Sequence, residues 1–104
     1  MSGDSPSAPS VVLVTGGRRG IGRAIAERFL AAGWTVALND TDAAGLADTV
    51  TALSNPGTVV SGHHADVGDR RQVEAMVADV YERHGRLDAL VPVMNNIVFV
   101  FFNL

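Results

Sequence analysis

Short apolar runs recur along the chain, and their pattern predicts β-strands. The first run, Val11–Val14, holds only aliphatic residues and is mostly β-branched, which is typical of a parallel strand buried on both faces. The third run is weaker than the others because polar residues interrupt it. The predicted strands cover residues 11–14, 35–38, 59–65 and 87–91.

Between these runs the apolar positions change to helical spacing. In the first such segment they are Ile21, Ala24, Ile25, Phe29 and Ala32. Gly33 is placed to end this helix, and Asp42 is a suitable cap for a second helix that extends to about Leu53. The third helix spans residues 70–84, with Gly85 as its stop. Its apolar stripe consists of Val73, Met76, Val77, Val80 and His84.

Strands that alternate with helices of this length predict βαβ units. Because such crossovers are right-handed, they place helices on both faces of one parallel sheet. We therefore expect an α/β fold with a doubly wound parallel sheet of about four strands. Residues 11–91 form this predicted domain.

The two ends of the chain depart from this pattern. Residues 1–10 are polar and rich in Ser and Pro, and we expect them to be a disordered leader. Residues 92–104 contain no Gly, Ala, Asp or Arg, but they hold three of the four phenylalanines. This composition predicts a separate apolar tail. Its apolar run, residues 97–102, is far shorter than the roughly twenty residues that span a bilayer.

Composition narrows the range of partners and locations. The formal net charge is -3, and the eight basic residues are all arginines without a basic tail, which argues against nucleic acid. No cysteine is present, so neither a disulfide nor a thiolate metal site can form. His63 and His64 are adjacent on a predicted strand and point to opposite faces, so we expect a structural role and no metal. Without a signal peptide or membrane span, the expected location is the cytoplasm.

The stretch Thr15–Gly22, TGGRRGIG, lies between the first predicted strand and the first predicted helix. Backbone N–H groups at a helix N-terminus are unpaired, and they can bind a pyrophosphate if no side chain blocks it. We expect Gly16 to allow the tight turn, Gly20 to permit close backbone approach, and Gly22 to let the helix pack on the sheet. The glycine spacing differs from the usual GxGxxG of dinucleotide sites.

Asp40 ends the second predicted strand, about where a dinucleotide fold places the carboxylate that accepts the ribose hydroxyls. The alternative is that Asp40, together with Asp42, merely caps a turn. Arg18 and Arg19 either contact a pyrophosphate or 2′-phosphate, or they are solvated loop side chains. These residues alone leave both choices open.

Three segments together resemble the short-chain dehydrogenase/reductase family. TGGRRGIG is similar to its TGxxxGIG cofactor motif, HADVGD to its adenine-binding DVxD segment, and GRLDALV to the strand before its NNAG motif. The resemblance covers residues 11–91 and implies a Rossmann-like NAD(P) fold, in which Asp66 bonds the adenine amino group and Val67 adds a contact. It also implies NAD as the preferred cofactor and NADP as the alternative, because Asp40 repels a 2′-phosphate. The expected cofactor-binding residues are Thr15, Gly16, Arg18, Arg19, Gly20, Ile21, Gly22, Asp40, Asp66 and Val67.

The residues that this family uses for chemistry are missing from the chain. In the family a Tyr is followed four residues later by a Lys, but this chain has no lysine and a single tyrosine, Tyr81. We therefore expect no catalytic residues, and we expect Tyr81 and His84 to be packing or surface residues. Pro92 interrupts the family pattern before Asn95-Asn96, as a frameshift, a truncated gene or a joined unrelated segment would.

Three functions stay open from the sequence. The chain is an N-terminal, cofactor-binding fragment of a family oxidoreductase, a stand-alone NAD-binding module without turnover, or an interaction protein that pairs through its tail. The family's sheet order begins 3-2-1-4, so the fourth strand is expected to be an edge beside the charge-free tail. The tail either pairs between molecules or returns antiparallel beside the fourth strand, and in both cases we expect self-association.

Overall fold

The computed structural model describes residues 9–94 and 97–102, so residues 1–8 of the predicted leader lie outside it. The helices in these ranges are α1 (Gly20–Ala31), α2 (Ala43–Leu53) and α3 (Arg70–His84). The strands are β1 (Val11–Thr15), β2 (Thr35–Asp40), β3 (Val60–His64), β4 (Ala89–Val91), β5 (Val93–Met94), β6 (Ile97–Val98) and β7 (Phe101–Phe102). None of the described helices is long and apolar enough to cross a bilayer.

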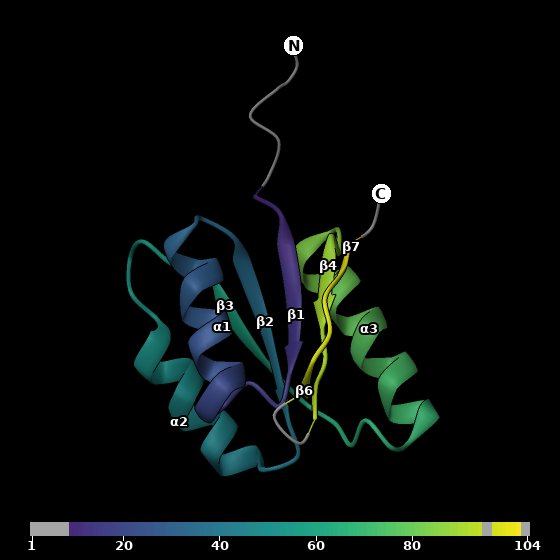
Figure 1. Cartoon of the computed structure of the whole chain (residues 1–104). Coiled ribbons are helices and arrows are strands. Elements are labelled where there is room, and N and C mark those ends of the chain that lie inside the picture. Colours follow the sequence, from purple (N-terminus) through teal and green to yellow (C-terminus); the bar gives the residue numbers. More distant parts are fainter. Residues whose placement is uncertain (1–8, 95–96, 103–104) are drawn as a thin grey trace.

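The main sheet has the strand order β3-β2-β1-β4-β7 (Figure 1). β1 pairs in parallel with β2 on one side and with β4 on the other, and β2 pairs in parallel with β3. β7 lies antiparallel to β4, with Ala89 opposite Phe102 and Leu90 opposite Phe101. β5 and β6 form a separate antiparallel pair.

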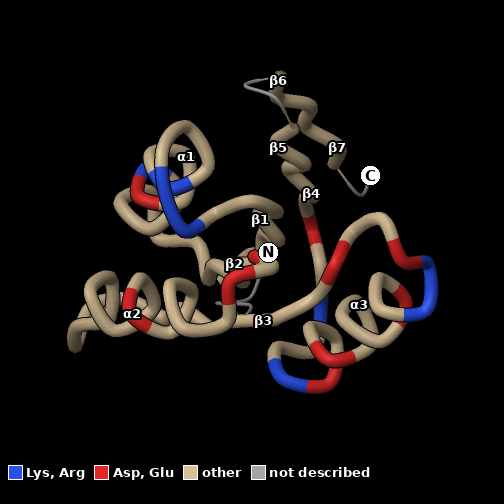
Figure 2. Tube along the Cα trace, turned by 90° about the horizontal axis from the view of Figure 1, so that it is seen from below, with Lys and Arg blue, Asp and Glu red and all other residues tan. Residues whose placement is uncertain are grey.

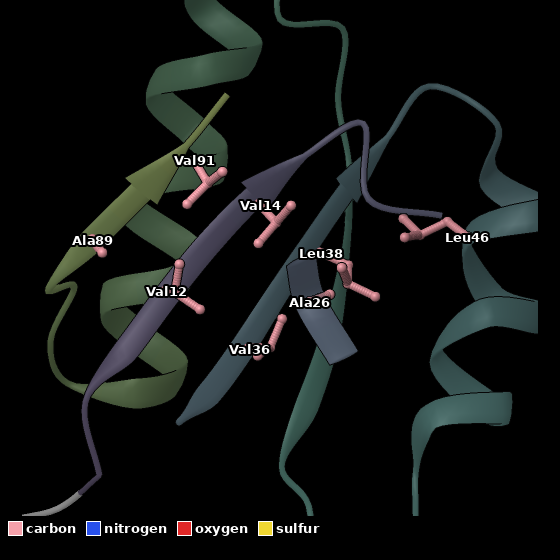
Figure 3. Packing of buried hydrophobic residues seen from close by; sticks show 8 residues of the cluster. All are labelled: Val12, Val14, Ala26, Val36, Leu38, Leu46, Ala89 and Val91. Carbon is pink, nitrogen blue, oxygen red and sulfur yellow. The ribbon is translucent and has the colours of Figure 1, made fainter. Parts of the chain in front are cut away.

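Two helices cover one face of the sheet and the third covers the other: α1 and α2 lie on one side and α3 lies opposite (Figure 2). The chain runs from β1 through β2 to β3 and then returns past β1 to β4, so right-handed crossovers fall on opposite faces. The core on the first face contains Val12, Val14, Ala26, Val36, Leu38, Leu46, Ala89 and Val91 (Figure 3). The core under α3 contains Val11, Leu13, Ala37, Ala65, Met76 and Val80.

The predicted doubly wound α/β fold is confirmed. Every residue of β1 is buried, as its aliphatic composition predicted. Asp42 caps α2 by accepting a hydrogen bond from the N–H of Gly45 (2.9 Å), and Gly85 ends α3 in the left-handed region with φ of 79°. β3 and β4 are shorter than the predicted strands: β3 lacks Val59 and Ala65, and β4 lacks Leu87 and Asp88.

The tail returns beside β4 in the antiparallel direction, which was one of the two expected outcomes. β4 is therefore an interior strand, and of the two expected arrangements the one that leaves β4 as an edge is wrong, because β7 covers it. The six consecutive apolar residues Ile97–Phe102 remain 36% to 58% exposed. The outer surface of the sheet on this side is consequently apolar.

Candidate functional site

The loop after β1 lies at the carboxyl end of the sheet, between the two helix layers. The chain continues from β1 into α1, which covers one face of the sheet. The strand beside β1, β4, follows α3, which covers the opposite face. Such a change of direction leaves a crevice in which open α/β sheets bind ligands. A pocket of about 430 Å³ lies there, lined by Gly16, Arg18, Arg19, Gly20, Ile21, Gly22, Asp40, Thr41, Asp42 and Val93.

Three glycines shape this loop in different ways. Gly16 and Gly20 have φ of 64° and 60°, a conformation that strains residues with a side chain. A Cβ atom on Gly20 would meet nothing within 4 Å, so the backbone there is open to close approach. A Cβ atom on Gly22 would overlap the carbonyl oxygen of Gly16. Gly22 thus lets the first turn of α1 pack tightly against the loop. The expected close contact was with the sheet, whereas the observed one is with the loop.

The N-terminus of α1 differs from those of the other two described helices. Asp42 caps α2, and Asp69 caps α3 by accepting hydrogen bonds from the N–H groups of Arg71 (2.9 Å) and Gln72 (3.3 Å). The N-cap residue of α1 is Arg19, whose side chain makes no capping hydrogen bond. The first turn of α1 therefore borders the pocket without a side-chain acceptor at its cap, an arrangement suited to an anion.

Arg18, Asp40 and Asp42 form the polar side of the pocket. Nε of Arg18 lies 3.4 Å from Oδ1 of Asp40, and its Nη2 lies 3.5 Å from Oδ2 of Asp42. Asp40 also accepts a hydrogen bond from the N–H of Asp42 (3.1 Å), so it makes the turn contact that was the alternative to ligand binding. The N–H of Gly45 and, more weakly, Arg18 lower the pKa of Asp42, which keeps a second carboxylate charged beside Asp40. Arg19, in contrast, is exposed.

Asp66 and Val67 lie on the loop between β3 and α3 and do not line this pocket. The N–H of Asp66 donates to Oε1 of Gln72 (2.9 Å), and its carboxylate accepts from the N–H of Gly68 (2.8 Å). Val67 is 41% exposed and, together with Thr15, lines a second, mostly apolar pocket of about 320 Å³. The structure therefore brings the glycines, both arginines, Ile21 and Asp40 together around one pocket. Thr15 lies next to this group, and Asp66 and Val67 lie on the β3–α3 loop.

Val93 forms a wall of the pocket that the sequence did not predict. Its N–H donates to Oγ1 of Thr15 (3.3 Å), and its carbonyl oxygen lies 3.1 Å from the position of a Cβ on Gly16. The start of the tail therefore lies against the glycine loop. The neighbouring Asn95-Asn96 pair lies outside the described residues.

Two buried polar residues, which no sequence motif indicates, make hydrogen bonds at the border of the site. The hydroxyl of Thr49 lies 3.0 Å from the carbonyl oxygen of Arg18, to which it can donate across from α2. The side-chain amide of Asn39 donates to the carbonyl oxygens of His63 and Ala65, both at 3.0 Å. These bonds fix the glycine loop to α2 and the end of β3 to β2. A polar residue inside an apolar strand or helix is the only signal for them.

The histidines and the tyrosine lie away from the pocket. His63 is buried and His64 is exposed, which confirms that they point to opposite faces of β3. Within the described ranges, no group of three or more His, Cys, Asp or Glu residues is placed to hold a metal ion. Tyr81 is 46% exposed on α3, whereas His84 makes a hydrogen bond to Ser61 beneath the helix.

Comparison with known proteins agrees with this geometry. The sequence model of the family described as short chain dehydrogenase matches residues 10–96. Levodione reductase from Leifsonia aquatica is 44% identical over 80 residues, which cover 75% of this chain and 30% of that protein. The BbsD subunit of a (2S)-[(R)-hydroxy(phenyl)methyl]succinyl-CoA dehydrogenase from Thauera aromatica is 40% identical over 81 residues, which cover 78% of this chain and 33% of that subunit.

Solved structures give the same result. A short-chain dehydrogenase/reductase from Burkholderia phymatum, crystallised in complex with NAD, superposes with a TM-score of 0.76 at 35% identity, covering 80% of this chain and 30% of that one. An actinorhodin polyketide ketoreductase crystallised with NADPH gives 0.77 at 38% identity, covering 81% and 32%. The chain thus spans about a third of the length of these relatives.

Proposed function

The chain belongs to the short-chain dehydrogenase family, and we propose that its glycine-loop pocket binds a nicotinamide dinucleotide. The observation that carries this proposal is the uncapped start of α1. Asp side chains fill the cap positions of α2 and α3, whereas the start of α1 combines a bare cap with open space beside Gly20. A pyrophosphate there supplies the missing acceptor for the N–H groups of the first turn.

The acidic side of the pocket supports NAD in preference to NADP. Asp40 is 15% exposed, at a point where its carboxylate can accept the ribose hydroxyls in place of part of its bond to Arg18. A 2′-phosphate at the same point meets the charges of Asp40 and Asp42, and Arg18 is already paired with both of these carboxylates. NADP binding therefore requires Arg18 to leave both partners.

The β3–α3 loop is proposed to hold the adenine end. The carboxylate of Asp66 is exposed, and its N–H bond to Gln72 fixes the loop against α3. Val67 presents an exposed apolar side chain next to it. In this proposal Thr15 acts indirectly, because its hydroxyl accepts the N–H of Val93 and so positions one wall of the pocket.

Oxidoreductase activity is proposed for the whole protein and not for these residues. A bound nicotinamide supplies hydride chemistry, but proton transfer to a carbonyl needs a positioned acid. The single tyrosine, Tyr81, lies on α3 and not in the glycine-loop pocket, and no lysine is present. These residues therefore function as a nucleotide-binding unit without turnover.

Self-association is a second proposed property, and it rests on the exposed tail. Ile97–Phe102 carries no charge, and its side chains are 36% to 58% exposed; its last two residues form β7, the outer strand of the main sheet. Edge strands that carry neither charges nor proline pair readily with other chains. A second copy of this chain offers the same strand, so two β7 segments can pair symmetrically.

The primary test is a calorimetric titration of the purified chain with NAD. The expected result is saturable binding that weakens when Gly20 is replaced by Asp, which places a negative charge where the pyrophosphate is proposed to bind. Gly57→Asp, on an exposed turn outside the pocket, is the matched control. Undetectable binding of NAD by a folded chain, or equal losses in both variants, would contradict the proposal.

A further inference from the structure

A continuous chain of side-chain hydrogen bonds joins α3 to β3. Oδ2 of Asp79 lies 2.8 Å from Nδ1 of His63, and Nε2 of His63 lies 2.8 Å from Oγ of Ser61. Oγ of Ser61 lies a further 2.8 Å from Nε2 of His84. The network thus begins and ends on α3 and passes through two residues of the strand.

The middle of this network is shielded from water. Ser61 and His63 are 5% and 4% exposed, and they project from the same face of β3 because they are two residues apart. Asp79 lies at the surface, and His84 is partly buried. Asp79 and His84 are separated by little more than one helical turn, so both reach the strand from the last part of α3.

With both imidazoles neutral, the hydrogen atoms fit this geometry in only one order. A carboxylate only accepts, so Nδ1 of His63 carries the proton that Asp79 receives. When His63 is neutral, its Nε2 then accepts the hydroxyl hydrogen of Ser61. Oγ of Ser61 keeps a lone pair, which accepts the Nε2–H of His84. Every donor has an acceptor, and both imidazoles are neutral.

Protonation disrupts this order. When both histidines are protonated, both Nε2–H groups point at Oγ of Ser61, whose hydroxyl hydrogen then has no acceptor within the network, and leaving a buried polar group unpaired is costly. A proton on Nδ1 of His84 adds a positive charge beside Arg83. The two histidines therefore act together, through the single hydroxyl between them.

Burial and the surrounding charges together also favour the neutral form of both histidines. Burial lowers the pKa of His63, and Asp79 offsets this only in part, while Arg83 and His84 lower it further. Burial also lowers the pKa of His84, again with Arg83 on the same side and Asp79 opposing. The strand contributes the neutral Ser61, and His64 faces away and bonds to the carbonyl oxygen of Thr41 (2.9 Å).

We propose that Asp79, His63, Ser61 and His84 form an acid-sensitive clamp, which fastens the last part of α3 to β3 at neutral pH and releases it when the histidines are protonated. The direction follows from linkage. Because the unfolded chain binds these protons more readily than the folded one, the stabilisation is complete above the ordinary histidine pKa of about 6.5. It is lost as the pH falls below that value towards the lowered folded-state values.

The clamp is tested by amide hydrogen exchange of the full chain between about pH 8 and about pH 5. The protection factors of the amides in residues 77–84 are expected to fall by about tenfold for each unit by which a histidine pKa is lowered. Ser61→Ala is expected to lower this protection already at pH 8 and to flatten its pH dependence. His64→Gln, the adjacent exposed histidine, is the matched control and should behave as the original chain does.

Unchanged protection of α3 across this pH range would overturn the proposal, as would a His64→Gln variant with the same flattening as Ser61→Ala. If Ser61→Ala does not fold, the unmodified chain still decides. Imidazole resonances followed by NMR should show His63 and His84 titrating below the ordinary histidine pKa of about 6.5. Titration of these two histidines at the ordinary value would refute the clamp.

Discussion

Nε of Arg18, in the glycine loop, lies 3.4 Å from Oδ1 of Asp40, at the end of β2. This pair joins the two segments that are proposed to hold the phosphates and the ribose. Both side chains are only partly exposed, at 23% and 15%, so the contact is shielded more than a surface ion pair is. The carboxylate proposed for the ribose is therefore already oriented before a ligand arrives.

Replacing Asp40 is expected to change cofactor preference. Asp40→Asn should weaken NAD binding by about 1.5–3 kcal/mol, or roughly ten- to hundredfold in Kd, because a charge-assisted bond to the ribose is lost. NADP binding should strengthen, because one of the two opposing charges is removed. Parallel calorimetric titrations with both cofactors measure the effect, and Asp48→Asn, exposed on α2, is the control. Tighter binding of NADP than NAD by the unmodified chain would show that Arg18 and Arg19 set the preference.

A methyl group on Gly22 is expected to destabilise the fold. In Gly22→Ala the new Cβ overlaps the carbonyl oxygen of Gly16, and it lies 3.1 Å from Cα of Gly17. Because these are backbone atoms, the loop must shift, at a cost of about 1–3 kcal/mol in the free energy of unfolding. Urea denaturation measures this cost. Gly57→Ala, whose Cβ meets only Oδ1 of Asn55 at 3.4 Å, should change stability little.

The fold was predictable because local patterns and global topology agree. The aliphatic run Val11–Val14, the helical spacing from Ile21 and the caps at Asp42 and Gly85 each specify an element without knowledge of its neighbours. The α/β class then follows from alternation alone. The glycine loop could also be located, because it must lie between a strand and a helix.

Contacts between distant segments could not be predicted. Val93 borders the glycine loop only because the chain turns after Pro92, and no periodicity marks that turn. The bond between Ser61 and His84 joins positions 23 residues apart, and each residue alone is an ordinary strand or helix residue. The antiparallel return of β7 was one of two open outcomes, because pairing between molecules uses the same backbone groups.

No nicotinamide-linked turnover is expected from this chain. Reduction of a carbonyl requires a proton donor beside the cofactor, and none of the residues that line the glycine-loop pocket is a tyrosine, lysine or histidine. Absorbance at the NADH band, followed with a panel of carbonyl substrates, measures this. Any residual rate should be unaffected by Tyr81→Phe. A steady rate that Tyr81→Phe abolishes would contradict the assignment.

The bond network at Asp88 is expected to stabilise the chain in a pH-dependent way. Asp88 accepts hydrogen bonds from Nε of Arg86 and from the N–H of Val11, both at 2.8 Å, so it fastens the segment before β4 to the start of β1. The bond from Arg86 lowers the pKa of Asp88, and its stabilisation is present above the ordinary Asp pKa of about 3.9 and lost below it. Because the site is partly exposed, Asp88→Asn should cost no more than about 1 kcal/mol at pH 7. Thermal unfolding at pH 7 and in acid should show the difference vanish at low pH, whereas Asp48→Asn should show none at either pH.

The exposed tail is expected to cause self-association. Phe99 and Phe101 stack on one another, with ring centroids 6.4 Å apart, and they are 55% and 57% exposed beside the outer strand of the sheet. Pairing two such strands buries these rings, and the burial of each large apolar side chain is worth about 1.5–3 kcal/mol. Changing Phe99, Phe101 and Phe102 together to Ser should therefore shift the sedimentation profile towards the monomer at tens of micromolar. Val59→Ser, an equally exposed apolar position away from the tail, should leave the profile unchanged. A monodisperse monomer before any substitution would contradict this prediction. It would show that the outer side of β7 does not pair with a second chain.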